Sequence, residues 1–381
     1  MMTMQQKMHF SSKKGSDKLS KPKEINVAGK PYFAWPYEDQ TQVKHNVLRA
    51  YSKIWIAKVG CLSNTLFFDC HGGCGAYIKE DGSVHFGSSI IVKTVGDEIN
   101  KNRTYKTGVY YCEIDRKNYD NFCKVIENTG SIKTVTFNDS FENVIRKQNV
   151  IKNYKKYPTL FLVDPFGYNF ALADLSGLMN SFGNEIIVNF MFDFINRFIS
   201  KPDLEESLNS YFGTNEWKQA KKLTGQQRET FLVYLFRKRF KEVTGAKYVF
   251  PYRLCYPDKN QTYYYLIHAT NHIDGITYMK EAFASLNNGR VQYLGKNNDV
   301  ITLFDWDCFK ADDIYNSFLK KYKKDSISFD SFWSEIVEDT AYTIKDLSKA
   351  VTELESIGKV TVTRIKSKRG SYKGNDIIHV L

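Results

Sequence analysis

The stretch that decides the fold is TLFLVDPFGY, residues Thr159–Tyr168. Its first part, Thr159–Val163, is a short run of apolar and β-branched residues, which is typical of a strand buried on both faces. The run ends in Asp164, a proline, an aromatic ring and a glycine. Such an ending is either an ordinary turn, since Asp and Pro begin turns, or a functional group at the carboxyl end of a parallel strand.

Similar apolar runs occur at four other places in the chain. They are NTLFFD, which ends at Asp69, TGVYYCE, which ends at Glu113, SIKTVTFND, which ends at Asp139, and NEIIVNFM. Helix-like stretches such as RKNYDNFCKVIEN separate most of them. KYVFPYRLCYP and TYYYLIHATN then follow as two strands joined by a short turn. The sequence therefore predicts an α/β fold, with a doubly wound, mostly parallel sheet of seven strands that closes with an antiparallel one.

The chain divides into regions of different character. We predict a disordered basic tail over residues 1–32, and an α/β domain over residues 33–310 with a helical insertion at about 192–247. Residues 311–381 contain three helix-like stretches, the last with Thr343 as a predicted N-cap, and then two strands. This is the order of elements in a winged helix-turn-helix domain.

Composition favours an anionic partner. The formal net charge is +12, which indicates a nucleic acid first and an acidic membrane surface second, with a charge that serves solubility alone as the alternative. No hydrophobic signal segment opens the chain, and no apolar run approaches membrane length. The seven cysteines show no pairing rhythm, so we expect free thiols and a reducing cytoplasm, with no membrane.

The ends of the first three predicted strands carry groups that suit an adenosine. Asp69 begins the turn Asp-Cys-His-Gly-Gly-Cys-Gly, in which Gly73 and Gly75 permit close approach of a ligand. Glu113 is placed to accept hydrogen bonds from ribose hydroxyls, and Asp139 to meet the amino group of an adenine. A purely structural turn is the alternative explanation for the glycines. We expect the following segment, AYIKEDGSVHFGSS, to form a loop over this site.

These strand ends, the closing hairpin and the Asp-Pro-Phe-Gly sequence resemble class I S-adenosylmethionine-dependent methyltransferases. More narrowly, about residues 33–285 resemble the three-Cys-motif partner (TcmP) family, on the segments VKHNVLRAYSKIW, FFDCHGGCGAY, YYCEID, LFLVDPFGY, EIIVNFMFDFINRF and YYYLIHATNHIDGITYMKEA. The resemblance implies S-adenosylmethionine as cofactor and a three-Cys-motif partner protein that resembles radical S-adenosylmethionine enzymes. The glycine turn departs from the family, whose members more often have an Ala-Gly-Pro-Gly type loop.

The resemblance also gives the opening stretch a function. In methyltransferases that modify the amino group of a base, an acid or amide, a proline and an aromatic ring follow the fourth strand. The acid accepts hydrogen bonds from the amine, and the ring stacks on the base. Asp164 and Phe166 are the matching candidates here, although Gly167 replaces the usual last residues. A structural turn that closes the pocket is the alternative.

Three further groups have both a functional and a structural explanation. Lysines and arginines near the C-terminus form an acid-free cationic cluster, which predicts phosphate contact with DNA or RNA or else a protein-docking surface; they include Lys359, Arg364, Lys366, Lys368, Arg369 and Lys373. Cys70 and Cys74 match no common metal pattern, so we predict no metal site and buried free thiols. His45 is interpreted as a surface or boundary residue rather than an acid–base group.

Two functions from different classes follow. The first is an S-adenosylmethionine-dependent methyltransferase that acts on nucleic acid or a nucleotide, in phage defence or mobile-element conflict alongside its partner. The second is a non-catalytic adapter with a methyltransferase-like body that binds nucleic acid or a partner protein. The carboxylates at consecutive strand ends favour the first, because an adapter does not need them.

Overall fold

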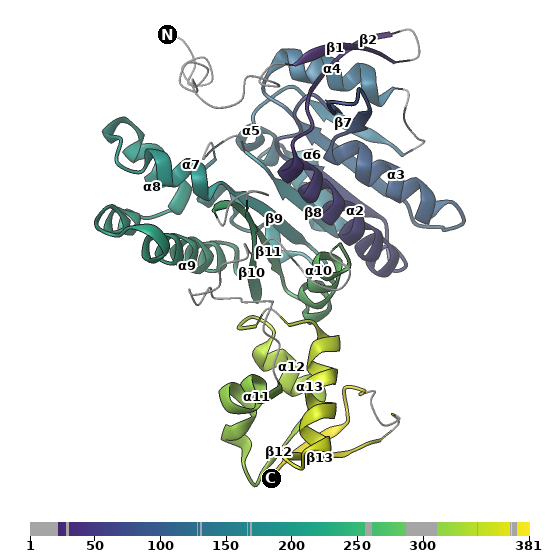
Figure 1. Cartoon of the computed structure of the whole chain (residues 1–381). Helices are drawn as coiled ribbons and strands as arrows, with labels where there is room; N and C mark the ends of the chain where they lie inside the picture. The colour runs from purple at the N-terminus through teal and green to yellow at the C-terminus, as the bar shows by residue number, and fades with distance from the viewer. Residues whose placement is uncertain are drawn as a thin grey trace.

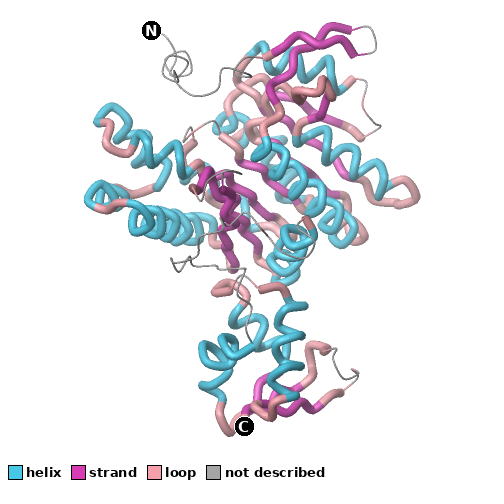
Figure 2. The backbone as a smooth tube through the Cα atoms, viewed as in Figure 1, coloured by secondary structure: helices cyan, strands magenta, loops and turns pink. Residues whose placement is uncertain are grey.

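The computed structural model describes residues 22–27, 30–127, 129, 132–165, 167, 170–255, 261–286, 311–340, 342–365, 367 and 372–381. Within these residues the central sheet has seven strands (Figures 1 and 2). In spatial order they are β10 (Tyr248–Cys255), β11 (Thr262–Thr270), β9 (Glu185–Phe190), β8 (Thr159–Val163), β3 (Thr65–Asp69), β6 (Thr107–Cys112) and β7 (Thr134–Phe137).

Strand directions confirm the predicted class. β3, β6, β7, β8 and β9 are mutually parallel, whereas β11 runs antiparallel to both β9 and β10. The order therefore grows outward from β3 through β6 to β7, and outward from β8 through β9 to the closing hairpin. This is the Rossmann-like arrangement of class I methyltransferases, with its topological switch point between β3 and β8.

Side chains alternate between two hydrophobic layers, one on each face of the sheet. Phe67 and Leu162 belong to the layer under α2 (Asp39–Val59), α3 (Ser88–Asn100) and α10 (Ile273–Ser285). Phe68 and Val163 belong to the layer under α5 (Phe141–Ile145) and α6 (Gln148–Lys156). Each fully buried side chain of this kind contributes about 1.5–3 kcal/mol. Burial on both faces explains why the strands read as continuous apolar runs.

A small second sheet corrects two predictions at the N-terminal side. It has the order β1 (Lys23–Val27), β2 (Lys30–Pro36), β4 (Ala76–Ile78) and β5 (Val84–Phe86). The predicted tail over residues 1–32 therefore ends too late, because the strand structure begins at Lys23. The predicted loop after Gly75 is a β-hairpin. Both strand pairs are stabilised by packing of Tyr32 and Ala76 with Phe122 of α4 (Arg116–Ile126), a contact that no local pattern reveals.

The predicted helical insertion is confirmed. Its α-helices are α7 (Phe192–Phe198), α8 (Glu205–Phe212) and α9 (Gly225–Thr244). Aromatic side chains of β9, α8 and α9 pack together, with the rings of Phe190 and Phe236 centred 4.8 Å apart. No helix in the described ranges combines the length and apolar character that crossing a membrane requires.

The described residues between 311 and 381, here called the C-terminal unit, form a small lobe below the body in Figure 1. Its elements are α11 (Ala311–Ile314), a π-helical turn (Tyr315–Leu319), α12 (Phe329–Ile336), α13 (Ile344–Ser356), and a sheet ordered β12 (Ser326–Ser328), β14 (Ile377–Val380), β13 (Val360–Thr363). Thr343 caps α13 as predicted, since its hydroxyl accepts from the Asp346 backbone N–H at 3.2 Å. β12 was not predicted, because a strand of three residues with polar neighbours is too short to show an alternating pattern.

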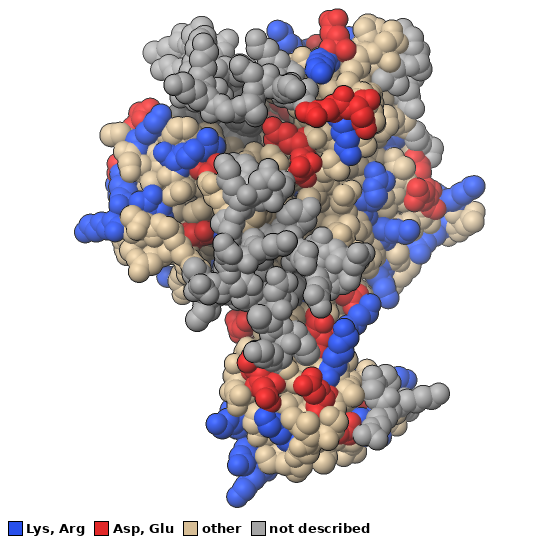
Figure 3. Space-filling view, in the orientation of Figure 1, with Lys and Arg blue, Asp and Glu red and all other residues tan. Residues whose placement is uncertain are grey.

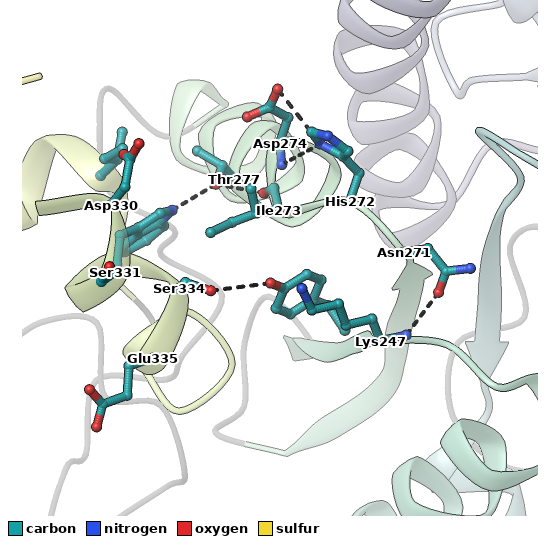
Figure 4. A pocket seen from close by; sticks show the side chains of 13 residues that line it. Lys247, Asn271, His272, Ile273, Asp274, Thr277, Asp330, Ser331, Ser334 and Glu335 are labelled. Carbon is teal, nitrogen blue, oxygen red and sulfur yellow. Dashed lines mark hydrogen bonds and ion pairs between the residues drawn. The ribbon is translucent and has the colours of Figure 1, made fainter. Parts of the chain in front are cut away.

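The C-terminal unit and the body share one apolar core. Hydrogen bonds between the two parts add to this contact. The Trp333 Nε1–H donates to Thr277 Oγ1 on α10 at 2.8 Å. Lys280 is fully buried, and its ammonium donates to the Thr340 carbonyl and lies 4.2 Å from the centre of the Phe250 ring. A cleft of about 660 Å³ opens along this seam. Figure 4 shows its lining residues, which come from α10 and α12 among other segments.

Glu338, a partly buried acid of the C-terminal unit, is expected to contribute strongly to the contact between this unit and the body. It accepts from the Val249 backbone N–H at 2.8 Å and from Lys241 Nζ at 2.9 Å. Glu338→Gln should lower the free energy of unfolding by about 2 kcal/mol, because hydrogen bonds to a charged group contribute about 1.5–3 kcal/mol. Asp313→Asn, at an exposed acid of α11, is the matched control and should change it by less than about 0.5 kcal/mol. Urea unfolding of both variants measures this, and equal effects would contradict the assignment.

Candidate active site at the carboxyl edge of the sheet

Two carboxylates lie beside each other at the topological switch point. β3 ends at Asp69, and β8 ends directly before Asp164. The strands are parallel neighbours, and the Cys70 backbone N–H donates to the Leu162 carbonyl at 2.9 Å. Open α/β sheets bind their ligands at this place. The structure thus brings together the two acids that the sequence places at the ends of the first and fourth strands.

Asp69 is fully buried, and its pKa is raised to about 6. Burial is the main cause, and the nearby Asp164 carboxylate acts in the same direction, while hydrogen bonds from two serines oppose it. Ser88 and Ser89, in the first turn of α3, both donate to Oδ2, Ser89 at 2.8 Å. The other oxygen, Oδ1, is buried and has no partner among the described residues. Because such an oxygen costs about 1–3 kcal/mol, it marks a position for a ligand donor.

Asp164 has the opposite electrostatic character. Burial alone would raise its pKa, but the charge and hydrogen bond of Lys44, with a hydrogen bond from Asn189, outweigh burial and leave the pKa below its usual value. Lys44 Nζ donates to Oδ2, and Asn189 Nδ2 donates to Oδ1 at 2.6 Å. Asp164 is therefore ionised at neutral pH. It is a strong hydrogen-bond acceptor and a poor proton acceptor.

Glu113 holds the glycine turn in place from the tip of β6. Its Oε2 accepts from the Gly73 backbone N–H at 2.9 Å, and its Oε1 accepts from the Asp115 backbone N–H at 2.7 Å. Burial raises its pKa. Gly73 has a φ of +66°, and a Cβ built on it would meet only the Tyr77 hydroxyl, at 4.0 Å. The backbone at Gly73 therefore faces open space beside a carboxylate that still has lone pairs free.

Gly75 and Asp139 complete the predicted cofactor set, with different surroundings. Gly75 has a φ of +79°, and a Cβ there would lie 2.7 Å from the Phe122 ring, so it is required for packing. Asp139 follows β7 and accepts from Asn143 Nδ2 at 2.9 Å and from Lys147 Nζ at 3.0 Å. These contacts, led by Asn143, lower its pKa. Asp139 is thus already well supplied with donors.

Sequence reasoning missed three polar side chains that surround Asp164. Lys44 comes from α2 and Asn189 from β9, and His71 lies in the glycine turn. Burial lowers the pKa of His71 to about 4, against the opposing effect of Asp164, so its ring is neutral at pH 7. Both His71 Nδ1 and Asn189 Oδ1 are buried without a partner in the described chain. In the sequence, only the Lys44-His45 pair on α2 drew attention to one of these side chains, and the pair alone does not show that Lys44 contacts Asp164.

His45 corrects a prediction. Rather than a boundary residue it is 3% exposed, and its Nδ1 lies 3.1 Å from the Tyr37 hydroxyl. Its ring is 5.2 Å from that of Tyr77 and 5.5 Å from that of Tyr37, centre to centre. Burial, followed by the Lys44 charge, lowers the pKa of His45 to about 3. The histidine therefore fixes the N-terminal sheet against α2 as a neutral ring.

This burial predicts an acid-sensitive fold. Because the folded-state pKa of His45 lies near 3 and the unfolded value near 6.5, only the unfolded chain gains this proton as the pH falls below 6.5. At pH 5 this should remove about 2 kcal/mol from the free energy of unfolding. Between pH 8 and pH 5, the free energy of unfolding of His45→Gln should therefore fall by about 2 kcal/mol less than that of the wild type. Thermal and urea unfolding at both pH values measure it, and identical losses in wild type and variant would contradict it.

Several predicted site residues lie outside the described chain. They are Phe166, Lys366, Lys368 and Arg369. Gly167 has a φ of +82°, which agrees with its expected turn. Lys373 is described and exposed. The C-terminal basic cluster has less free positive charge than the sequence alone indicates. Arg364 pairs with Glu355 at 2.5 Å, and Lys359 pairs with Asp312 at 2.6 Å.

The cysteines of the glycine turn are free and buried. Burial raises the pKa of the Cys74 thiol to about 11 and moves that of Cys70 well above its usual value. Both are therefore protonated at neutral pH and unreactive as nucleophiles.

Comparisons with known proteins return structural likeness at low similarity. No protein-family model matches the chain, and no curated protein matches it in sequence. A solved protein from Legionella pneumophila is 12% identical over 65% of this chain and 91% of its own, with a TM-score of 0.41. Trm1 from Pyrococcus horikoshii, solved with S-adenosyl-L-methionine, is 9% identical over 68% and 64%, with a TM-score of 0.35. An rRNA methylase from Streptococcus thermophilus is 9% identical over 57% and 93%, with a TM-score of 0.30. The fold assignment rests on the strand order of this chain, because TM-scores this low do not establish a fold.

Proposed function

We propose that this chain is an S-adenosylmethionine-dependent methyltransferase that modifies an amino group of a nucleic acid or nucleotide. The observation that carries the proposal is the pair of carboxylates at the switch point. Asp69 has a pKa raised to about 6 and Asp164 a lowered one, so two neighbouring acids lose their protons in different pH ranges at one edge of the sheet. Environments that separate two pKa values in this way are typical of functional sites.

The residues present fit the cofactor. Gly73 offers open backbone, Glu113 retains acceptor capacity for ribose hydroxyls, and Asp69 Oδ1 is a buried oxygen without a described partner. When bound, S-adenosylmethionine supplies an activated methyl group. Asp139 would contact the adenine amino group only with the lone pairs that Lys147 and Asn143 leave free.

Asp164 is best suited to orient the substrate amine rather than to remove its proton. An ionised carboxylate with a lowered pKa accepts an N–H hydrogen bond strongly but holds a proton weakly. Positive charge that develops on the nitrogen during methylation strengthens that hydrogen bond. Asn189 Oδ1, which has no described partner, is a second acceptor beside Asp164 for the other amine hydrogen. The methylated nitrogen, which carries a positive charge after transfer, releases a proton to solvent.

Lys44 sets a condition on this proposal. Its ammonium already donates to Asp164, at the oxygen where a substrate amine would also donate. A carboxylate oxygen accepts more than one hydrogen bond, so both donors can share it. The same ion pair is the observation that favours the alternative, a non-catalytic adapter in which Lys44 permanently satisfies Asp164.

Nucleic acid is the proposed substrate class because of charge. The net charge of +12 and the exposed Lys373 support a polyanion. We also propose that the C-terminal unit is a winged helix-turn-helix that contacts the substrate, and that a three-Cys-motif protein is the partner in phage defence or mobile-element conflict. The order of α11, α12, α13 and β13–β14 supports the first of these.

Transfer of a radiolabelled methyl group to mixed cellular DNA and RNA tests the function. We expect label in one nucleic acid fraction with the wild type, and a nuclease digest then identifies the modified base. Cofactor binding without any label in either fraction, with and without the partner, would favour the adapter.

A further inference from the structure

A second charged surface lies at the amino edge of the central sheet, opposite Asp164. Four segments form it: 57–64, 100–107, 152–159 and 180–184. They contain no Asp or Glu. Their basic residues are Lys58, Lys101, Arg103, Lys106, Lys152, Lys155 and Lys156, and all except Arg103 are exposed. We call these four segments the amino-edge surface.

Hydrogen bonds join the first two segments into one rim. Arg103 Nη1 donates to the Ala57 carbonyl at 3.0 Å, at the C-terminal end of α2. The Lys106 backbone N–H donates to Asn64 Oδ1 at 2.8 Å, and the Lys106 carbonyl accepts from Thr65 N–H at 3.0 Å. The lysines at 58, 101 and 106 are thereby held on one rigid edge.

The other two segments continue the same rim. Asn184 accepts from the Thr159 backbone N–H at 2.9 Å and donates to the Tyr154 carbonyl at 3.1 Å. A Cβ built on Gly183 would lie 2.9 Å from the Pro158 ring and 3.5 Å from Val59. The segment 180–184 therefore touches both the end of α6 and the end of α2.

Exposed apolar side chains stand among these lysines. Phe182 is 74% exposed, Leu62 63% and Tyr105 40%. Each shortly precedes a strand of the sheet, so all three project from the amino edge. Two of the three are aromatic rings, and exposed rings beside lysines provide the combination of stacking and charge that binds single-stranded nucleic acid.

No described acid neutralises four of these lysines, although the Lys106 ammonium also donates to the Asn100 carbonyl at 2.8 Å. Within the described residues, Lys58, Lys106, Lys155 and Lys156 form no ion pair with a carboxylate. Figure 3 shows Lys and Arg side chains running down the right-hand side of the body, where Figure 1 places α2 and α3.

We infer that the amino-edge surface binds single-stranded nucleic acid. The lysines supply phosphate contacts, and unpaired bases stack on Phe182 and Tyr105. A duplex hides its base faces, so it would use the lysines alone and leave the rings in water. This surface is on the opposite edge from Asp69 and Asp164, so its occupancy does not depend on the proposed methyl transfer.

Fluorescence anisotropy with labelled oligo(U) and oligo(dT) of about 20 nucleotides, beside a duplex of the same length, tests the inference. The variant carries Gln at Lys58, Lys106, Lys155 and Lys156. We expect its affinity for single strands to fall at least tenfold at low salt. The slope of log K against log salt should become shallower by about 0.7 for each phosphate that the variant no longer binds. Comparison of the two oligonucleotides distinguishes RNA from DNA.

The matched control carries Gln at Lys201, Lys222, Lys238 and Lys320, which are likewise exposed and lie elsewhere. It has the same net charge, and its affinity should change by less than about threefold. Phe182→Ala should weaken single-strand binding by about 5- to 100-fold without affecting the duplex. Alkylation of Cys61, an exposed thiol within this rim, should slow when an oligonucleotide is bound, as read by peptide mass spectrometry.

Three results would overturn the inference. Equal weakening in the two lysine variants would assign binding to net charge alone. Tighter binding of the duplex, with no effect of Phe182→Ala, would remove the base-stacking role. Binding of polyglutamate but of neither oligonucleotide would assign the surface to an acidic protein. Cofactor binding should equal that of the wild type in every variant, which keeps this test separate from that of the proposed methyltransferase.

Discussion

Asp164→Asn should lower methyl transfer by about 10- to 100-fold and change the affinity for S-adenosylmethionine by less than about threefold. Asn keeps the shape and one acceptor oxygen but loses the charge. The interaction that is removed is the one that strengthens as the substrate nitrogen becomes positive, so the effect falls on turnover rather than on binding. Initial rates with tritiated cofactor, beside equilibrium dialysis of the cofactor, measure the two effects separately.

Lys44 provides the control for this prediction. In Asp164→Asn its ammonium loses the carboxylate with which it pairs, so a lower rate has two possible origins. The double variant Lys44→Met, Asp164→Asn removes the unpaired charge and should stay as slow as the single variant. Recovery of activity in the double variant would assign the loss to Lys44. Wild-type rates in Asp164→Asn itself would make Asp-Pro-Phe-Gly a structural turn.

Glu113→Gln should weaken S-adenosylmethionine binding by about 10- to 100-fold, because a hydrogen bond to a charged group contributes about 1.5–3 kcal/mol. The substitution also places an amide NH₂ against a backbone N–H, at either Gly73 or Asp115, so the glycine turn loses one support. Equilibrium dialysis at neutral pH measures the affinity.

The matched control for Glu113 is Asp120→Asn, which neutralises an exposed acid on α4 that pairs with Arg116. Its cofactor affinity should equal that of the wild type. Thermal unfolding of Glu113→Gln distinguishes a missing hydrogen bond to the cofactor from a collapsed turn. Unchanged affinity in a folded Glu113→Gln protein would exclude Glu113 from the cofactor site.

Much of the sheet could be predicted because its strands are buried on both faces. Continuous apolar runs such as Thr159–Val163 have no other common structural explanation at that length. Their order along the chain, with helices between them, then leaves few topologies, and the closing hairpin identifies the class. The carboxylates at the strand ends could be predicted for the same reason, since Asp69 and Asp164 follow directly from where the runs end.

The small second sheet could not be predicted, because its pairing depends on distant contacts. β2 and β4 are parallel neighbours although Trp35 and Tyr77, which pair, lie far apart in the chain. A three-residue strand has no period to detect. The buried position of His45 follows from the same sheet, since Tyr37 covers it from the end of β2.

The partners of Asp164 were missed for a similar reason. Lys44 lies 120 positions before Asp164 in the sequence, and Asn189 lies on another strand. A lysine on a helix and an asparagine in a strand each have many ordinary explanations. Only the fold shows that both side chains donate to the Asp164 carboxylate. The ion pair with Lys44 is the main contact that lowers the pKa of Asp164.

Calorimetric titration of the wild-type protein with S-adenosylmethionine tests the central claim most directly. The account predicts saturable binding of about one molecule per chain with micromolar affinity, and a thermal midpoint that rises with cofactor concentration. S-adenosylhomocysteine should bind in the same range, since the parts of the cofactor proposed to contact Asp69, Gly73 and Glu113 are present in both molecules. No heat from either compound, together with an unmoved thermal midpoint, would contradict the account and leave a methyltransferase-like fold without its cofactor.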